Sequence, residues 1–470
     1  MRHPLIHSAL LVIAASLLVG CTVGPNYRKP VVPVPNAYHG PNDNPHDQAQ
    51  AQAASFADLP WWQVFQDSVL QDLIRRALKQ NYDLQTATEK ITQARAQLRV
   101  TRSDQFPQLT ANANAVDERS FQGFPFTTRY GTYAADATFQ LDVFGQLRRA
   151  TESARAQLLA TEYAQRTEIL TLVSDVASDY FALLSLDLQL QITRDTIKTQ
   201  EDAVKLTHYR LEHGVATKLD VLQAKQVLDT ANAQLPELQR QIGLEEDALS
   251  ILLGDYPQSV TRGLALVDQK FPPEVPAGLP SSLLARRPDI SQAEQNLISA
   301  NAQIGVAKAA FFPQISLTGS GGGAVGRSTV FSSLVNSNIG TWSVGGQLTQ
   351  PIFEAGKLRG NLHIAESQQR QSLIAYKQAI QRAFKDVSDA LITYQKYYEV
   401  RTAQQTTVQD LSDSVSTSLK RYRGGIATYL EVLDNQRSLF SAQLTLAQDR
   451  GNEFQSLVQL YKALGGGWRQ

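Results

Sequence analysis

Two very long stretches without glycine or proline constrain the fold of this chain most strongly. The first runs from Gln146 to His213 and the second from Asn361 to Arg423. As a helix, the first would be about 100 Å long, whereas helices of globular proteins average about 12 residues. An apolar residue at every seventh position indicates a seam that packs against partner helices. The seam residues are Val176, Leu183, Leu190, Ile197, Val204 and Leu211, and then Leu373, Ile380, Val387 and Tyr394.

The chain also contains a tandem repeat with a period of about 206–211 residues. Its landmarks return in the same order: 94–108 as 300–314, 144–148 as 353–359, and 210–222 as 421–433. We therefore predict two duplicated modules, 66–255 and 281–465, joined by a connector at 256–280. Each module has a helix, two strands, a long helix and a last helix. The expected bounds are strands 104–118 and 131–144, long helix 146–213 and helix 217–253, and then strands 312–321 and 340–353, long helix 357–423 and helix 428–464. Pro236 should kink or break the helix at 217–253.

The predicted strands alternate apolar and polar residues with a period of two, as in Tyr133–Val143. Strands of about ten residues can cross a bilayer when tilted, and the two faces suit a barrel with lipid outside and water inside. Two soluble hairpins that pack one face on a core are the alternative. Four strands cannot close around a channel, and open edges in lipid are costly. Two, three or four copies would give 8, 12 or 16 strands, with residues 119–130 and 322–339 as outward loops.

The N-terminus has the pattern of an export signal. Arg2 precedes the apolar segment Ala9–Val19, which ends in Gly20-Cys21. This pattern resembles the bacterial lipobox, in which removal of residues 1–20 leaves Cys21 to carry diacylglycerol on sulfur and an acyl chain on nitrogen. Thr22, by the same resemblance, favours delivery to the outer membrane. An uncleaved anchor helix is the alternative, but the segment is short for a membrane span. No other apolar run approaches 18 residues, so no transmembrane helix is expected after residue 21, and residues 21–65 should form an extended, lipidated strap.

Composition argues against several classes of function. Lys+Arg and Asp+Glu balance at 44 each, so no basic field attracts nucleic acid. Cys21 is the single cysteine, which excludes an intrachain disulfide framework and a cysteine-rich zinc site. His208 and His213 lack metal-ligand spacing, and the glycine-rich segment 319–324 is a weak match to a dinucleotide loop because no helix follows it. It suits a barrel strand that bends into a loop. We expect no enzyme, no metal and no cofactor other than the lipid on Cys21.

Several motifs together resemble the outer membrane factor (TolC-like) family, in its lipoprotein branch that serves resistance–nodulation–division (RND) pumps. They are the lipobox, Gly24-Pro25-Asn26-Tyr27, the paired Phe-Pro-Gln turns, the 420–425 segment and the 461–468 ending. The resemblance implies an α+β membrane protein: a homotrimeric 12-stranded outer-membrane β-barrel, with four strands per chain, continuous with a long periplasmic α-helical coiled-coil barrel. It also implies a periplasmic adaptor (membrane fusion) protein and an inner-membrane RND-type transporter as partners.

The resemblance further implies a periplasmic gate where the long and last helices meet. The matching positions are Arg421, Tyr422, Leu430 and Asp434, with Arg210 and Asp220 as partners from the first module. Three Leu430 side chains would form an apolar constriction, and three Asp434 carboxylates an acidic ring. The expected function is therefore an exit duct for small amphipathic compounds. The duct of a type I protein secretion system and a pore-less structural coiled-coil lipoprotein are the alternatives.

Overall fold

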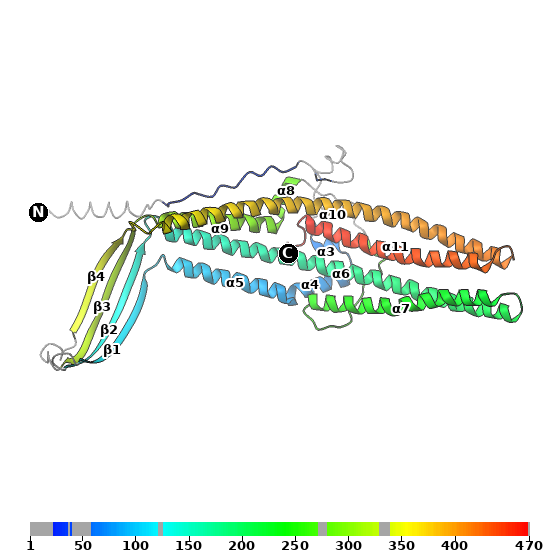
Figure 1. Ribbon diagram of the computed structural model, residues 1–470, viewed down its shortest axis with the longest axis horizontal. Helices are drawn as coiled ribbons and strands as arrows, with labels where there is room; N and C mark the ends of the chain where they lie inside the picture. The colour runs from blue at the N-terminus through cyan, green and yellow to red at the C-terminus, as the bar shows by residue number, and fades with distance from the viewer. Residues whose placement is uncertain are drawn as a thin grey trace. The chain divides into compact units, whose positions relative to one another are not determined.

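The structure, a computed structural model, describes residues 22–35, 38–39, 58–120, 126–270, 280–328 and 339–468. The predicted signal 1–20, Cys21 and much of the strap lie outside the described residues. Figure 1 shows the elements in this order: α3 (Trp61–Val64), α4 (Ser68–Gln80), α5 (Tyr82–Ser103), β1 (Gln108–Ser120), β2 (Phe126–Leu141), α6 (Gln146–Glu212), α7 (Lys218–Leu252), α8 (Pro280–Arg286), α9 (Pro288–Ala309), β3 (Gln314–Ser328), β4 (Ile339–Thr349), α10 (Lys357–Arg423) and α11 (Tyr429–Ala463). The succession of helix, two strands, long helix and last helix thus occurs twice.

The chain divides into two compact units, and each draws on both halves of the repeat. The first unit comprises residues up to Val32, Glu89–Glu162 and Gln292–Gln378. The second comprises Pro33–Thr88, Tyr163–Ser291 and the chain from Ala379 onward. The repeats are therefore interleaved and do not form separate bodies, because each long helix contributes its first turns to one unit and the rest to the other.

The two long helices, α6 and α10, have 67 residues each. Their predicted seams are confirmed: Val176, Leu183 and Val387 are fully buried, and no seam residue is exposed. α7 continues through Pro236 as one helix, so the predicted break does not occur. Ala231 and Leu238, on either side of the proline, are buried, and this packing offsets the loss of one helical hydrogen bond.

Helix α6 also holds an apolar window that the sequence pattern conceals. An 18-residue window within it has a mean hydropathy of 1.5, enough to cross a membrane by length and composition alone. Isolated polar residues interrupt it, which is why a search for uninterrupted apolar runs misses it. Since 61% of this window is buried within the fold, its apolar character is that of a core helix.

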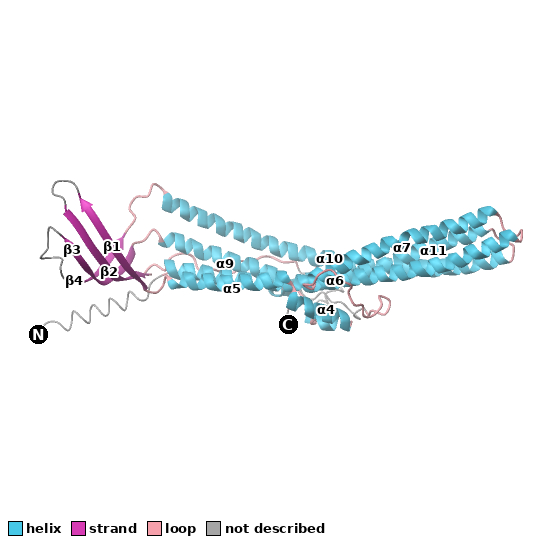
Figure 2. Ribbon diagram, turned by 90° about the horizontal axis from the view of Figure 1, so that it is seen from below, coloured by secondary structure: helices cyan, strands magenta, loops and turns pink. Residues whose placement is uncertain are grey.

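The four strands form one antiparallel sheet in the order β1-β2-β3-β4, visible as a single layer in Figures 1 and 2. Directly paired residues lie on the same face, and the register pairs Ala113 with Tyr133, Phe139 with Leu317, and Gly319 with Val344. All predicted apolar positions therefore share one face. The opposite face is polar and carries hydrogen bonds between neighbouring strands, such as Asn112 to Asp136 (2.7 Å) and Ser320 to Ser343 (2.7 Å).

The strands differ from their predicted bounds at both ends. β1 extends to Ser120, β2 begins at Phe126 and β3 extends to Ser328, so parts of the predicted outward loops belong to the sheet. The rest of those loops, residues 121–125 and 329–338, lies outside the described residues. The glycine-rich segment 319–324 lies inside β3. A Cβ at Gly322 would lie 2.0 Å from the Tyr133 carbonyl oxygen of the neighbouring strand, so this position requires glycine. Glycine here permits close pairing of strands and does not start a loop. At the other end, β2 ends at Leu141. The carboxylate of the next residue, Asp142, accepts hydrogen bonds from the Leu147 and Arg148 N–H groups in the first turn of α6.

The strap that follows Cys21 is held within the first unit by side chains from both repeats. Arg149 on α6, whose side chain is 5% exposed, donates to the Asn26 side chain (2.6 Å) and to the Gly24 carbonyl (3.4 Å). Asn301 on α9 donates to the Pro25 carbonyl (2.9 Å). Gly24 has a φ of +104°, and a Cβ there would lie 2.5 Å from the Gly305 Cα. In the Gly-Pro-Asn-Tyr motif the strap passes directly over α9, and Gly24 is required there because of its positive φ and its close approach to Gly305.

Replacing Arg149 with alanine should release this strap. The substitution leaves the Asn26 side chain and the Val23 and Gly24 carbonyls without the Arg149 donor, and a lost buried partner costs about 1–3 kcal/mol. Trypsin cleavage after Arg28 should accelerate by at least about tenfold, whereas the bond after Lys29 resists trypsin because Pro30 follows it. The same replacement at Arg155, which is exposed on α6, is the matched control and should leave cleavage unchanged. Equal cleavage rates in both variants would contradict the assignment of Arg149 as the residue that fastens the strap.

Candidate channel gate

The two long helices end in turns of the same geometry. At the end of α6, Val215 N–H donates to the Arg210 carbonyl (2.8 Å), and at the end of α10, Ile426 N–H donates to the Arg421 carbonyl (2.9 Å). Gly214 and Gly425 have φ values of +72° and +74°, the left-handed conformation that favours glycine at a helix C-terminus. The repeat therefore positions Arg210 and Arg421 equivalently.

A small apolar core, here called the tip core, joins the helices near these turns. It contains Ala224 and Val227 of α7 with Tyr429, Val432 and Leu433 of α11, all buried, and partly buried Val204, Leu419 and Tyr422 pack against it. Helices α7 and α11 contact each other. Hairpins from the two repeats are therefore held together by one shared core.

Two of the predicted gate residues meet at the edge of the tip core. The Arg210 guanidinium lies 4.6 Å from the centre of the Tyr422 ring, a cation–π geometry. Tyr422 also lies against Tyr429, with ring centres 5.1 Å apart. Burial, followed by Tyr422 and Asp220, raises the pKa of Tyr429 to about 12. Burial also raises the pKa of Tyr422, with a further contribution from Asp220 and opposition from Arg210. Both phenols therefore stay neutral at physiological pH.

The acidic residues next to the two turns behave differently in the two repeats. Asp220 forms a capping box with Thr217, accepting from the Thr217 N–H (2.7 Å) while its own N–H donates to Thr217 Oγ1 (3.2 Å). Its counterpart Glu431 instead pairs with Arg421 at 3.3 Å. Asp220 is therefore the N-terminal cap of α7 and a negative charge near Tyr422 and Tyr429.

Leu430 and Asp434 stand apart from these contacts. Leu430 is 48% exposed and Asp434 is also exposed. They are four residues apart on α11 and so share a face of the helix. The sequence interpretation did not assign Glu431 or Thr428, although Thr428-Tyr429-Leu430-Glu431 has the T-x-x-E pattern of a capping box. The repeat offered a second indication, because Thr428 and Glu431 correspond to Thr217 and Asp220 of the first module.

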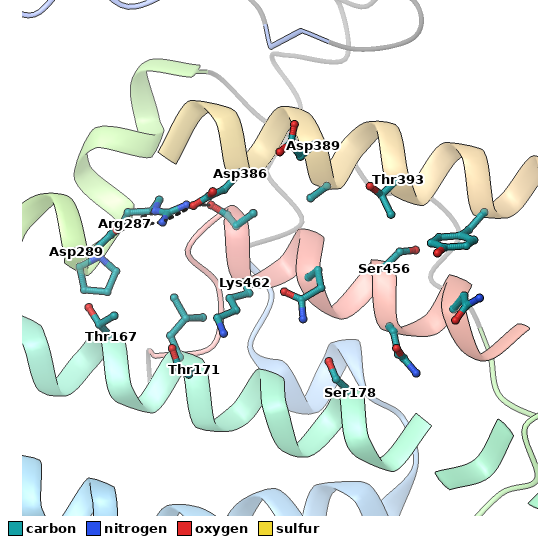
Figure 3. A pocket seen from close by; sticks show the side chains of 18 residues that line it. Thr167, Thr171, Ser178, Arg287, Asp289, Asp386, Asp389, Thr393, Ser456 and Lys462 are labelled. Carbon is teal, nitrogen blue, oxygen red and sulfur yellow. Dashed lines mark hydrogen bonds and ion pairs between the residues drawn. The ribbon is translucent and has the colours of Figure 1, made fainter. Parts of the chain in front are cut away.

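Another candidate for a site is a cavity of about 500 Å³ in the second unit. Figure 3 shows Thr167, Thr171 and Ser178 of α6 on one side, and Arg287 pointing toward Asp386. Arg287 donates to Asp289 (2.7 Å), to Asp386 (3.0 Å) and to the Ala463 carbonyl (3.2 Å). Burial opposes its charge, but these carboxylates keep its pKa above the ordinary value. Arg287 thus ties α9, α10 and α11 together, and we assign it a structural role.

Comparison with known proteins identifies the family. A family model described as outer membrane efflux protein matches residues 73–255 and 279–466. The chain belongs to the outer membrane efflux protein family. It is 37% identical over 456 residues to the cation efflux system protein CusC of Escherichia coli O6:H1, covering 97% of this chain and 98% of that protein. It is 38% identical over 465 residues to the probable efflux pump outer membrane protein TtgC of Pseudomonas putida, covering 97% and 95%.

A solved structure supports the same assignment. The open state of the Neisseria gonorrhoeae MtrE outer membrane channel aligns with a TM-score of 0.83 at 30% identity, covering 96% of this chain and 99% of that one. As an outer membrane efflux protein, the chain has the α+β channel fold and resides in the outer membrane. The resemblance seen in the sequence motifs is thereby confirmed.

Proposed function

We propose that this outer membrane efflux protein is the passive exit duct of a tripartite pump for small amphipathic organic compounds. An adaptor and an energised inner-membrane RND-type transporter are the partners, and Cys21 carries the lipid anchor. The observation that carries the proposal is the sheet: one face is apolar, the other is polar, and the order β1-β2-β3-β4 leaves β1 and β4 at its edges. Such a sheet is stable in lipid only when other strands pair with those edges.

Three copies are the assembly that we propose. They provide 12 strands, in the range of known outer-membrane barrels, and they bring three sets of hairpin tips around one axis. Leu430 and Asp434 then form rings, because each is exposed on α11 and free to face the axis. The apolar ring restricts water and the acidic ring fixes the neighbouring copies. Arg421, Tyr422 and Arg210 hold the tips from within each chain, and Asp220 caps α7 beside them.

The composition supports organic cargo over soft metal ions. Met1 is the only methionine and Cys21 the only cysteine, so the chain beyond residue 21 offers no sulfur ligand. Monovalent copper and related soft ions prefer thiolate and thioether ligands. A strain that lacks the gene should therefore become hypersensitive to toluene and amphipathic dyes. It should keep its copper tolerance and its secreted proteins. Loss of a secreted protein would instead support the type I duct, and loss of copper tolerance would support metal export.

The native mass of the detergent-extracted protein tests the assembly directly. We expect a trimer for the wild type and for Cys21→Ser, because the sheet edges and the tip helices lie in residues beyond the lipid. Native mass spectrometry or light scattering gives the copy number. A trimer in both would make the lipid an anchor only. A stable monomer would mean that the four strands do not close, and the duct proposal would fail with it.

A further inference from the structure

The two helix N-termini at the hairpin tips have the same residue pattern but different hydrogen bonding. Thr217 and Thr428 occupy the N-cap positions of α7 and α11, with backbone angles (φ, ψ) of −99°, 161° and −78°, 158°. Asp220 and Glu431 occupy the third helical position after each. Thr217 and Asp220 complete a capping box, whereas the Thr428 side chain makes no capping hydrogen bond. The backbone of α11 is therefore ready for a cap that the side chains do not form.

The carboxylate that would complete this cap is engaged elsewhere. Glu431 Oε1 lies 3.3 Å from Arg421 Nε, and the two side chains are 41% and 51% exposed. This ion pair joins the last turn of α10 to the first turn of α11 across Gly424 and Gly425. Exposed ion pairs and capping boxes are of comparable strength. The exchange of one partner for the other is therefore nearly balanced in free energy, as a conformational switch requires.

We propose that Glu431 is a two-position switch of the gate. In the closed state its carboxylate holds Arg421 and so fixes α10 to α11. In the open state it turns to the Thr428 N–H, while Thr428 Oγ1 accepts from the Glu431 N–H, as Asp220 and Thr217 already do. The new cap compensates for the broken ion pair, and Arg421 is released. This inference rests on the proposed channel function, since it assigns Glu431 and Thr428 as positioning residues of the same gate.

The asymmetry between the repeats gives the switch its direction. In the first repeat the cap is already formed, and Arg210 lies on the Tyr422 ring instead of on an acid. The α6–α7 hairpin therefore has no alternative partner to exchange among these groups, and it acts as the fixed side of the tip core. In the α10–α11 hairpin, Leu430 directly precedes Glu431. A rotation of this segment therefore moves the proposed apolar ring of Leu430 side chains directly.

The test compares Glu431→Gln, Thr428→Val and the double variant in reconstituted trimers. Glutamine can still accept the capping hydrogen bond, but it lacks the negative charge that pairs with Arg421. Glu431→Gln should therefore raise the open probability about threefold to tenfold. Thr428→Val has the same shape without the oxygen and should remove that increase in the double variant. Thr217→Val is the matched control from the first repeat and should leave the increase intact. Amide hydrogen exchange at residue 431 should slow in Glu431→Gln and recover in the double variant, because Thr428→Val removes the oxygen that accepts from this N–H.

The outcomes separate this inference from the function on which it rests. If Asp434→Ala conducts but Thr428→Val does not suppress the effect of Glu431→Gln, then Glu431 acts through Arg421 alone and the switch is overturned. Faster amide exchange in Glu431→Gln overturns it as well, since simple loss of an ion pair would loosen this turn. If neither the wild type nor any variant conducts, including Asp434→Ala, the channel function itself fails.

Discussion

Replacing Asp434 with alanine should raise the conductance of the reconstituted channel at least about tenfold. Among the described residues, none forms an ion pair with Asp434, and its carboxylate is exposed beside Leu430. In the proposed trimer it is therefore available to donors on the neighbouring copy. Breaking three charge-assisted hydrogen bonds, each worth about 1.5–3 kcal/mol, shifts a closed population strongly toward the open one. Single-channel recording in planar bilayers measures the change.

A charge-matched control keeps this result specific. Asp413→Ala removes the same charge from an exposed position of α10 and should leave conductance unchanged. Tyr422→Phe retains the ring that packs on Arg210 and Tyr429, so only contacts of its hydroxyl are lost and a smaller increase is expected. Wild-type conductance in the Asp434→Ala variant would contradict the gate assignment, whereas the fold and the family assignment would stand.

Asp67→Asn should cost a large amount of folding stability. Asp67 is 2% exposed and caps α4, accepting from the Val69 N–H at 2.8 Å. Its second carboxylate oxygen accepts from the Tyr180 hydroxyl (2.8 Å), the Leu264 N–H (3.0 Å) and the Gln269 side chain (2.8 Å). Every partner is a donor, so the amide nitrogen of asparagine cannot replace an oxygen without a buried clash of donors. We expect a loss of about 3 kcal/mol.

The same network gives a pH dependence with a definite sign. Burial alone would raise the pKa of Asp67, but hydrogen bonds from Gln269, Tyr180, Leu264 and Val69 outweigh it and hold the pKa below its ordinary value. The contribution of Asp67 to stability is therefore complete above the unfolded pKa, about 4, and is lost as the pH falls through the lower, folded pKa. Asp67→Asn should lose this acid-dependent part of the stability.

Thermal unfolding in detergent, followed by circular dichroism, provides the comparison for Asp67. The control is Asp72→Asn on the same helix, whose side chain is 75% exposed and pairs only along the helix with Arg75. Exposed pairs of this kind contribute about 0–1 kcal/mol. Similar unfolding temperatures in the two variants would show that the buried network is not the support that its geometry indicates.

Much of the fold follows from periodic patterns in the sequence. The seven-residue spacing of Val176 and Leu183 identifies the buried side of α6, because a helix of this length must bury one stripe along its whole course. The two-residue alternation of 131–144 likewise identifies the two faces of the sheet. These patterns are local, and each residue needs only its place in a regular element to be assigned. The duplication also identified the paired turns and, with them, Arg210 and Arg421.

The tertiary structure decided which partners those residues take. Arg421 pairs with Glu431, Arg210 packs on Tyr422, and Asp220 caps its own helix, although the two repeats share one pattern. Asp67 and Arg149 gain their importance from partners more than a hundred residues away, so no local pattern could identify them. The ends of the strands could not be predicted from the sequence either. In the glycine-rich β3, too few positions carry side chains for the alternation of apolar and polar residues to be recognised. Periodicity fixes which face of an element is buried, but the choice among several competent hydrogen-bond partners depends on the relative positions of helices and strands that only packing sets.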